Sequence, residues 1–174
     1  MSLTSIPAES RHTADARLPG TGTAGAGLAT RSAEHTAALK AAGLRVTGPR
    51  LAVLAELAEH PHADAETVRA GVLSRLGSVS TQAVYDVLRA LTEVGLLRRI
   101  EPEGSPGRYE IAGEDDNHHH VVCRGCGAVA DVPCAVGHAP CLEASDDQGF
   151  TIDRAEVIYW GTCARCRSAQ PQPA

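Results

Sequence analysis

Between residues 33 and 95 the apolar positions recur every three or four residues, the spacing that places them on one face of a helix. This pattern predicts four helices, over residues 33–42, 49–59, 64–76 and 81–94. Residues that favour helix ends stand at the predicted boundaries: Pro49 suits a first turn, Asp64 and Ser80 suit N-caps, and Gly43 and Gly95 suit left-handed stops.

After Gly95 the period changes, and residues 96–101 and 108–112 flank the turn sequence Pro-Glu-Gly-Ser-Pro-Gly, which predicts two strands and a loop. Helices followed by a strand pair are typical of a winged helix-turn-helix, whose last helix enters the major groove. The last predicted helix offers polar groups that read bases or phosphates: Thr81, Gln82, Tyr85 and Arg89. A small helical bundle with a hairpin that binds nothing is the alternative, and we favour the DNA-binding interpretation.

Short strands are predicted over 121–123, 128–132 and 150–161, with a short helix over 138–148. So small a sheet cannot bury both of its faces alone, which predicts that the chain forms a homodimer. The predicted fold class is therefore α+β, with an N-terminal winged helix-turn-helix and a small C-terminal α/β dimerisation domain.

The composition supports two folded parts with polar ends. With 174 residues, 43% of them hydrophobic, the chain is long enough to bury a core. We expect a disordered extension over 1–32, rich in Ala, Thr, Gly and Ser, a DNA-binding domain over 33–112 and a hinge over 113–117. A dimerisation and metal-binding domain is expected over 118–167, and a flexible tail over 168–174.

Charge is divided unevenly between the two parts. The net charge is -5, but residues 45–99 carry seven Arg against six acidic residues, whereas residues 101–166 carry twelve acidic residues against four Arg. The acidity therefore belongs to the C-terminal part, where it attracts cations, and the N-terminal part is free to approach phosphate.

Two C-x-x-C pairs predict a structural zinc site. Zinc favours thiolate ligands in a tetrahedron, and each short turn points two sulfurs at one centre: Cys123 and Cys126, then Cys163 and Cys166. Four reduced structural cysteines are the alternative. Because no secretory signal and no stretch of 18 apolar residues is visible, we expect a cytoplasmic protein without a membrane span and with reduced thiols.

The two further cysteines, Cys134 and Cys141, are not needed for that site. They are inert or they pair under oxidation, and the inert interpretation is slightly favoured because no nearby positive charge is evident. An enzyme is not expected. A zinc deaminase needs H-x-E ahead of P-C-x-x-C, which Pro140-Cys141-Leu142-Glu143 lacks, and neither C-x-x-C lies in a thioredoxin-like context.

Four segments resemble the ferric uptake regulator family of metal-dependent bacterial repressors. They are Gly43-Leu44-Arg45-Val46-Thr47-Gly48-Pro49-Arg50, Ser80-Thr81-Gln82-Ala83-Val84-Tyr85, His118 to Cys126 with Asp131, and Tyr159-Trp160-Gly161-Thr162-Cys163-Ala164-Arg165-Cys166. The resemblance spans about residues 33–166. It is greatest to the actinobacterial branch that represses catalase-peroxidase genes, through DNHHHVVCRGCG and AEVIYWGTC.

The resemblance implies a regulatory site between the two domains for Fe(II) or Mn(II), with the ligands His60, Glu110, His118, His120 and Asp131. This mixed nitrogen and oxygen set suits those ions. Without the resemblance, His60 and His62 would be assigned to the surface at a helix end, and the histidine run would be a solvated loop. The resemblance also implies DNA contacts by Arg45 and Arg50, and a dimer on AT-rich palindromic promoter DNA.

The expected function is therefore a repressor of catalase-peroxidase and its own operon, released when peroxide oxidises a ligand, with His60 and His118 as candidates. An iron-sensing repressor is the alternative, with zinc or nickel sensing behind it. Three positions depart from the family pattern. Glu110 stands where peroxide sensors often have Asp, Ala155 stands where a second regulatory site needs His, and Asp86 would repel phosphate.

Overall fold

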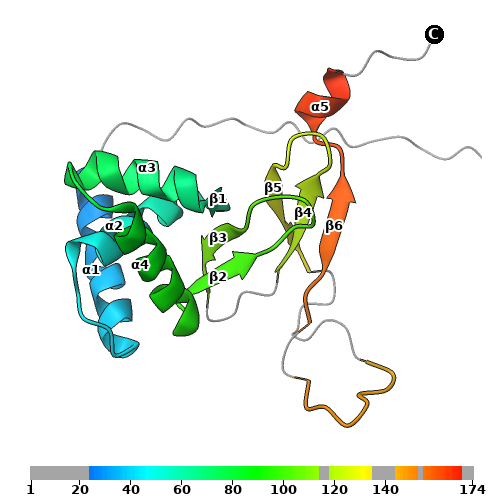
Figure 1. The fold of residues 1–174 in the computed structure, drawn as a ribbon, viewed down its shortest axis with the longest axis horizontal. Helices are drawn as coiled ribbons and strands as arrows, with labels where there is room; N and C mark the ends of the chain where they lie inside the picture. The colour runs from blue at the N-terminus through cyan, green and yellow to red at the C-terminus, as the bar shows by residue number, and fades with distance from the viewer. Residues whose placement is uncertain (1–23, 114–117, 135–143, 153–154, 170–174) are drawn as a thin grey trace, which may run out of the picture.

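The computed structural model describes residues 24–113, 118–134, 144–152 and 155–169. The N-terminal part contains four helices, α1 (Ala24–Ala41), α2 (Gly48–Glu59), α3 (Ala65–Leu76) and α4 (Thr81–Glu93) (Figure 1). They are followed by an antiparallel sheet of β1 (Ala63–Asp64), β2 (Leu97–Ile100) and β3 (Arg108–Ile111), in the order β1-β3-β2. This arrangement is a winged helix-turn-helix with a short third strand.

Apart from the start of α1, the helix ends lie within one residue of the predicted ends. The carboxylate of Asp64 accepts a hydrogen bond from the Thr67 amide at 2.8 Å, and the Ser80 hydroxyl accepts one from the Ala83 amide at 3.2 Å. Gly95 follows α4 with a φ of 75°, the left-handed conformation that a helix stop requires. Apolar faces of all four helices meet in one core, which includes Leu39, Val53, Leu57, Val68, Val72, Val84, Leu88 and Leu91.

One prediction for this part is wrong, and one strand was missed. Residues 24–32 are helical rather than disordered, because α1 begins at Ala24, in a stretch whose alanines favour a helix. The strand β1 was not predicted, since two residues carry no detectable period.

The C-terminal part is a sheet of β4 (His118–Cys123), β5 (Val129–Pro133) and β6 (Ile158–Gly161), followed by α5 (Ala164–Ser168). Strand β4 is central, antiparallel to β5 and parallel to β6. The strand predicted over 150–161 is shorter than expected, and residues 144–148 of the predicted 138–148 helix are not helical. Residues 138–143 lie outside the described residues, as do 1–23, 114–117 of the expected hinge, and 170–174 of the tail.

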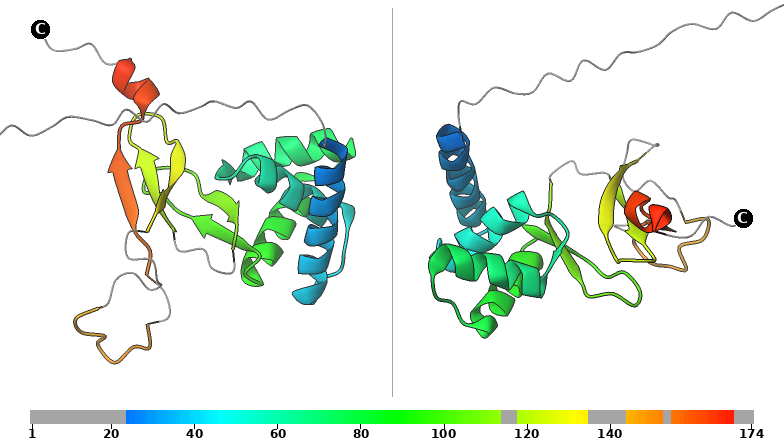
Figure 2. Two further views of the ribbon diagram at one scale, coloured as in Figure 1. Left: turned by 180° about the vertical axis from the view of Figure 1, so that it is seen from behind. Right: turned by 90° about the horizontal axis from the view of Figure 1, so that it is seen from above.

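The first sheet lies between the helices and the second sheet in all views (Figures 1 and 2). Its strand β3 therefore faces groups from both parts of the chain. Among the helices that the structure describes, none combines the length and the apolar character needed to cross a membrane.

Candidate metal centres and DNA-binding surface

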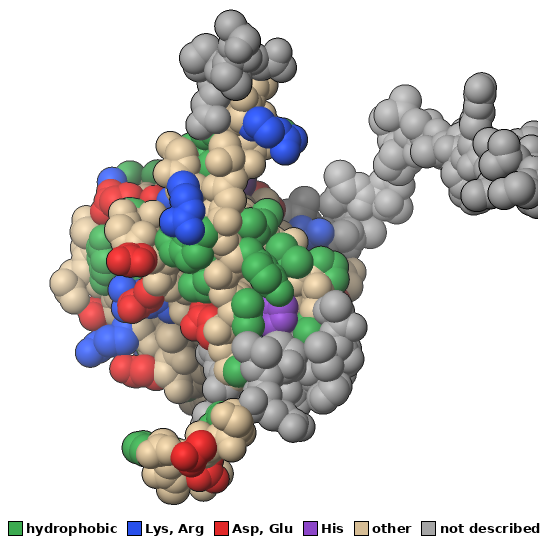
Figure 3. Space-filling model, turned by 90° about the vertical axis from the view of Figure 1, so that its right-hand side faces the viewer, with side chains coloured by type: hydrophobic (Ala, Val, Ile, Leu, Met, Phe, Trp, Pro, Cys, Tyr) green, Lys and Arg blue, Asp and Glu red, His purple; other side chains and the backbone are tan. Residues whose placement is uncertain are grey.

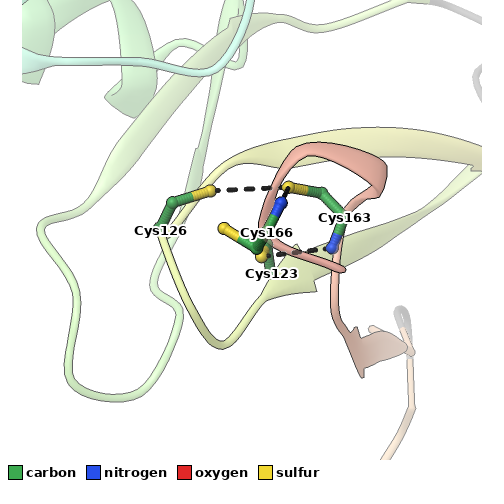
Figure 4. A group of neighbouring side chains, drawn as sticks. All are labelled: Cys123, Cys126, Cys163 and Cys166. Carbon is green, nitrogen blue, oxygen red and sulfur yellow. Dashed lines mark hydrogen bonds between the residues drawn. The ribbon is translucent and has the colours of Figure 1, made fainter. Parts of the chain in front are cut away.

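Four thiols converge where the turn after β4 meets the start of α5 (Figure 4). The sulfurs of Cys123, Cys126, Cys163 and Cys166 all lie within 4.8 Å of one another, and those of Cys126 and Cys163 are 3.7 Å apart. Sulfurs about 2.3 Å from a tetrahedral zinc ion are about 3.8 Å apart. The four predicted cysteines thus have the spacing and chemistry of a zinc-binding group.

A backbone amide stabilises the negatively charged form of one of these sulfurs, the form that binds a cation. The Cys163 amide donates to the Cys123 sulfur at 3.3 Å, and this bond lowers the pKa of the Cys123 thiol to about 6. Conversely, hydrogen bonds with Cys126 and Cys163 raise the pKa of the Cys166 thiol to about 12. The amide bond therefore favours the thiolate form of Cys123, the form that binds a metal, and a bound metal would displace the protons of the other thiols.

Gly125 gives this turn the room it needs. A Cβ atom built on Gly125 would lie 3.2 Å from the Cys166 sulfur, a tight contact, so a side chain there would push against a ligand.

All four thiols are needed for the tetrahedron, which leaves no open position for substrate chemistry.

A second group of nitrogen and oxygen atoms lies between the two sheets. We call it the interlobe site and define it as His62, Glu110, His118, His120 and Asp131. The His62 Nε2 lies 2.9 Å from the Glu110 Oε2 and 2.8 Å from the Asp131 Oδ1. The His120 Nε2 lies 3.0 Å from the same Glu110 oxygen, and the His118 Nε2 lies 3.4 Å from the same Asp131 oxygen.

These separations suit a single ion, because neighbouring ligand atoms about 2.1 Å from a metal at right angles are about 3.0 Å apart. Glu110 and His120 are buried and His62 is partly buried, whereas the Asp131 side chain is half exposed. The mixed donor set is the one that Fe(II) and Mn(II) accept. The interlobe site thus fits a divalent ion, with Asp131 on its solvent side.

Strand register explains how these residues meet. Side chains along a strand point alternately to its two faces, so His118 and His120 lie on the same face of β4. Asp131 is the direct partner of His120 on β5. On the other sheet, Ala63 of β1 pairs with Tyr109 of β3. The residue before Ala63 therefore arrives beside the residue after Tyr109, which brings His62 to Glu110.

His60 is not brought into this site, contrary to the expectation from the family resemblance. Its Nδ1 instead contacts Glu56 on α2 at 2.9 Å, and its side chain is 60% exposed. His62 occupies the place expected for it, with a side chain 9% exposed and a backbone φ of 61°, unusual for a non-glycine residue. Sequence reasoning missed His62 because only the pairing of β1 with β3 distinguishes the two histidines.

The charge state of Glu110 follows from this environment. Burial alone would raise its pKa, but hydrogen bonds from His120 and His62 lower the pKa well below its usual range. The pKa of His62 is raised, because its contacts with Glu110 and Asp131 outweigh its own burial. The carboxylate is thus ionised and ready to act as a ligand.

The histidine run is not a solvated loop, since it lies in β4. His119 points to the opposite face from its neighbours, where it is buried and packs edge-on against Tyr159 at 6.0 Å between ring centroids. Of the two remaining cysteines, Cys134 is half-buried, and Cys141 lies outside the described residues.

The predicted DNA-contacting residues of α4 form an exposed row of Thr81, Gln82, Tyr85 and Arg89. Within it, the Gln82 amide donates to the Asp86 Oδ1 at 2.9 Å, and Arg89 approaches the same oxygen at 3.7 Å. Asp86 thus holds two of these groups along the helix. At the start of α2, Arg50 donates to the Arg45 carbonyl oxygen at 2.6 Å, while the Arg45 side chain remains exposed.

Comparison with known proteins agrees with this architecture. The chain is 59% identical over 133 residues to the transcriptional regulator FurA of Mycobacterium tuberculosis, and the matched stretch covers 76% of this chain and 90% of that protein. It is 59% identical over 134 residues to the ferric uptake regulation protein 1 of Mycolicibacterium fortuitum, covering 77% and 83%.

Solved structures give the same picture. The Vibrio cholerae ferric uptake regulator matches with a TM-score of 0.56 and 29% identity, covering 74% of this chain and 98% of that one. The Pseudomonas aeruginosa regulator, solved with manganese, matches with a TM-score of 0.60 and 27% identity, covering 75% and 98%. The profile of the ferric uptake regulator family matches residues 41–159, and this chain therefore belongs to that family of transcriptional regulators.

Proposed function

We propose that this chain is a metal-dependent repressor that binds promoter DNA as a homodimer when Fe(II) or Mn(II) occupies the interlobe site. One observation carries the proposal: the site draws His62 and Glu110 from the DNA-binding part, and His118, His120 and Asp131 from the C-terminal part. An ion bound there supplies one positive centre that both parts share. The manganese in the P. aeruginosa relative supports this choice of ion.

The coupling to DNA follows from linkage. Strand β3, which carries Glu110, pairs with β2, and β2 follows the recognition helix α4. If the ion favours one arrangement of the two parts, and DNA binds that arrangement better, each ligand tightens the binding of the other by the same factor. Zinc in the four-cysteine group would hold α5 against the turn after β4, and so keep the C-terminal part folded.

The outer face of the C-terminal sheet supports the homodimer. Hydrophobic side chains gather on that side of the molecule (Figure 3), and Tyr159 of β6 is a large exposed one. Phe150 and Ile152, in the segment before β6, are also exposed. In the described residues of this part, the buried hydrophobic side chains are only Val122 and Cys123. A second copy covering this face would bury it, and a monomer in sedimentation of the zinc-loaded protein at micromolar concentration would contradict the dimer.

Metal-dependent DNA binding is the main test. Fluorescence anisotropy with an AT-rich palindromic promoter duplex and zinc-loaded protein is expected to show binding that Mn(II) tightens by at least about tenfold. His120→Ala removes a buried member of the site and should abolish the response to Mn(II). His35→Ala, on α1 and away from the site, is the matched control. Equal DNA affinity with and without Mn(II) in the parent protein would refute the proposal.

We further propose that the signal is peroxide, and that catalase-peroxidase and the chain's own operon are the targets, on the strength of the branch-level resemblance. In the interlobe site His62, rather than His60, joins His118 as a candidate for oxidation. Protein loaded with Fe(II) under nitrogen should release DNA after hydrogen peroxide, and a peptide carrying either histidine should gain the mass of one oxygen atom. Release by chelator but not by peroxide would favour the iron-sensing alternative.

A further inference from the structure

A partly buried ion pair adjoins the interlobe site. In the antiparallel pairing of β2 and β3, Arg98 is the direct partner of Glu110, so both side chains lie on the same face of the sheet. The Arg98 Nη1 lies 2.9 Å from the Glu110 Oε1, and the two side chains are 18% and 5% exposed. Such a charge-assisted contact in a sparsely hydrated place fixes the carboxylate firmly.

The two oxygens of Glu110 consequently have different partners. Oε2 faces the histidines, 2.9 Å from His62 and 3.0 Å from His120. Oε1 faces the guanidinium of Arg98, whose planar fork of N–H donors matches a carboxylate oxygen. One oxygen of the carboxylate therefore belongs to the interlobe site, and the other is bound by Arg98.

We propose that Arg98 is a positioning residue for the interlobe site, which reserves one Glu110 oxygen so that this glutamate offers the metal a single oxygen. This inference rests on the proposed function. A free carboxylate can bind an ion with one or both oxygens, and the choice changes the number of ligand atoms. Since zinc prefers four ligand atoms whereas Fe(II) and Mn(II) take more, that number bears on which ion the site prefers.

The charge of Arg98 has a second consequence. A fixed positive charge in contact with a ligand opposes binding of a cation, so Arg98 limits the affinity of the site while it stabilises the metal-free protein. Replacing it with a neutral residue should move these two properties in opposite directions. Metal binding should tighten, on the order of tenfold for a charge at this range in a partly hydrated medium. The metal-free protein should become less stable, because buried Glu110 loses its partner.

The experiment uses zinc-loaded, full-length protein and compares Arg98→Met with the parent. Mn(II) affinity is measured from the free-ion signal in electron paramagnetic resonance, and the visible spectrum of bound Co(II) reports the coordination number. Arg98→Met should bind Mn(II) about tenfold more tightly, give a weaker Co(II) band per ion, and melt at a lower temperature without Mn(II). Arg98→Lys, which keeps the charge and a donor, should restore the parent values.

The adjacent residue on the same strand offers a matched control. Arg99 has a half-exposed side chain that contacts Glu101 at 2.7 Å, so Arg99→Met should leave Mn(II) affinity and the Co(II) spectrum unchanged. Should Arg98→Met fail to fold, Arg98→Gln, which tolerates partial burial as a polar neutral group, is expected to tighten Mn(II) binding in the same way.

The outcomes separate the two proposals. If Arg98 merely braces the sheet, its variants melt earlier while Mn(II) affinity and the Co(II) spectrum stay at the parent values or the affinity falls, and this result overturns the positioning role alone. If the zinc-loaded parent binds no Mn(II), the proposed function is overturned, and the role of Arg98 with it.

Discussion

Replacing His60 and His62 separately by alanine tests the assignment of the interlobe site most directly. His62 is a partly buried member, with a side chain 9% exposed and two carboxylate contacts at 2.8 and 2.9 Å. Losing a residue that only supports a ligand costs about 10–100-fold in metal affinity, so losing the ligand itself should cost at least about 100-fold. That factor corresponds to about 2.8 kcal/mol of binding free energy.

His60→Ala should have almost no effect on metal binding. The removed contact joins the 60% exposed side chain of His60, at the C-terminal end of α2, to the buried Glu56 four residues earlier. A contact of this kind, screened by solvent on the histidine side, contributes about 0.3–0.5 kcal/mol of folding stability. Its partner Glu56 keeps a second contact, with Arg75 at 3.0 Å. Alanine at position 62 inherits the left-handed backbone without relieving it, so the two variants differ in ligand chemistry rather than in strain.

Isothermal titration of Mn(II) into zinc-loaded protein measures both variants, with the melting temperature as a check on folding. The expected result is a loss of at least about 100-fold for His62→Ala and a change within about twofold for His60→Ala. The opposite ranking, with His60 essential and His62 dispensable, would refute the reasoning from the β1–β3 register. It would also restore the ligand set that the resemblance implies.

Three further predictions concern pH, packing and DNA. The lowered pKa of Glu110 contributes stability above its usual pKa that is lost as pH falls through the lowered value, whereas the raised pKa of His62 contributes stability below 6.5 that is lost as pH rises through the raised value. Because metal binding requires neutral imidazole, the gain in melting temperature on adding Mn(II) should grow as pH rises from 6 to 8, and a flat profile would contradict this. Gly71→Ala should destabilise the protein by about 1–3 kcal/mol in chemical denaturation despite the better helix propensity, because the new Cβ would lie 2.0 Å from the buried Glu56 carboxylate carbon, and a stabilised variant would refute the contact. Asp86→Asn removes a negative charge from the face of α4 that is proposed to contact DNA, and it should tighten DNA binding in the anisotropy assay by about threefold to tenfold, with weaker binding as the contrary outcome.

The helices were predictable because their signals are local. Asp64 and Ser80 form N-caps with amides three residues away, and Gly95 ends α4 through its own backbone conformation. The four-cysteine group was equally readable, since each pair lies within one turn. These features depend on few residues and little on the remainder of the fold.

Pairings between distant segments were not predictable in this way. The parallel contact of β4 with β6 joins residues 38 apart, His120 and Ile158, and nothing in either segment specifies it. The two-residue strand β1 has no period of its own and exists because β3 offers an edge. The choice between His60 and His62 depended on that edge, which explains why sequence resemblance and geometry disagree at this point.

The strand β1 follows directly after His62, a member of the interlobe site with a strained backbone conformation. A non-glycine residue in the left-handed region costs on the order of 1 kcal/mol or more, and His62 keeps this conformation because β1 fixes the residues after it. Next to it, Arg108 of β3 contacts Asp64 of β1 at 3.4 Å and the Gly127 carbonyl beyond the first zinc-binding turn at 3.5 Å. The edge of this sheet therefore contacts the interlobe site through His62 and the zinc-binding part through Arg108. A shift of β1 would alter both contacts together, so under the proposed function we expect a metal ion in the interlobe site to act on the two parts of the chain through this edge.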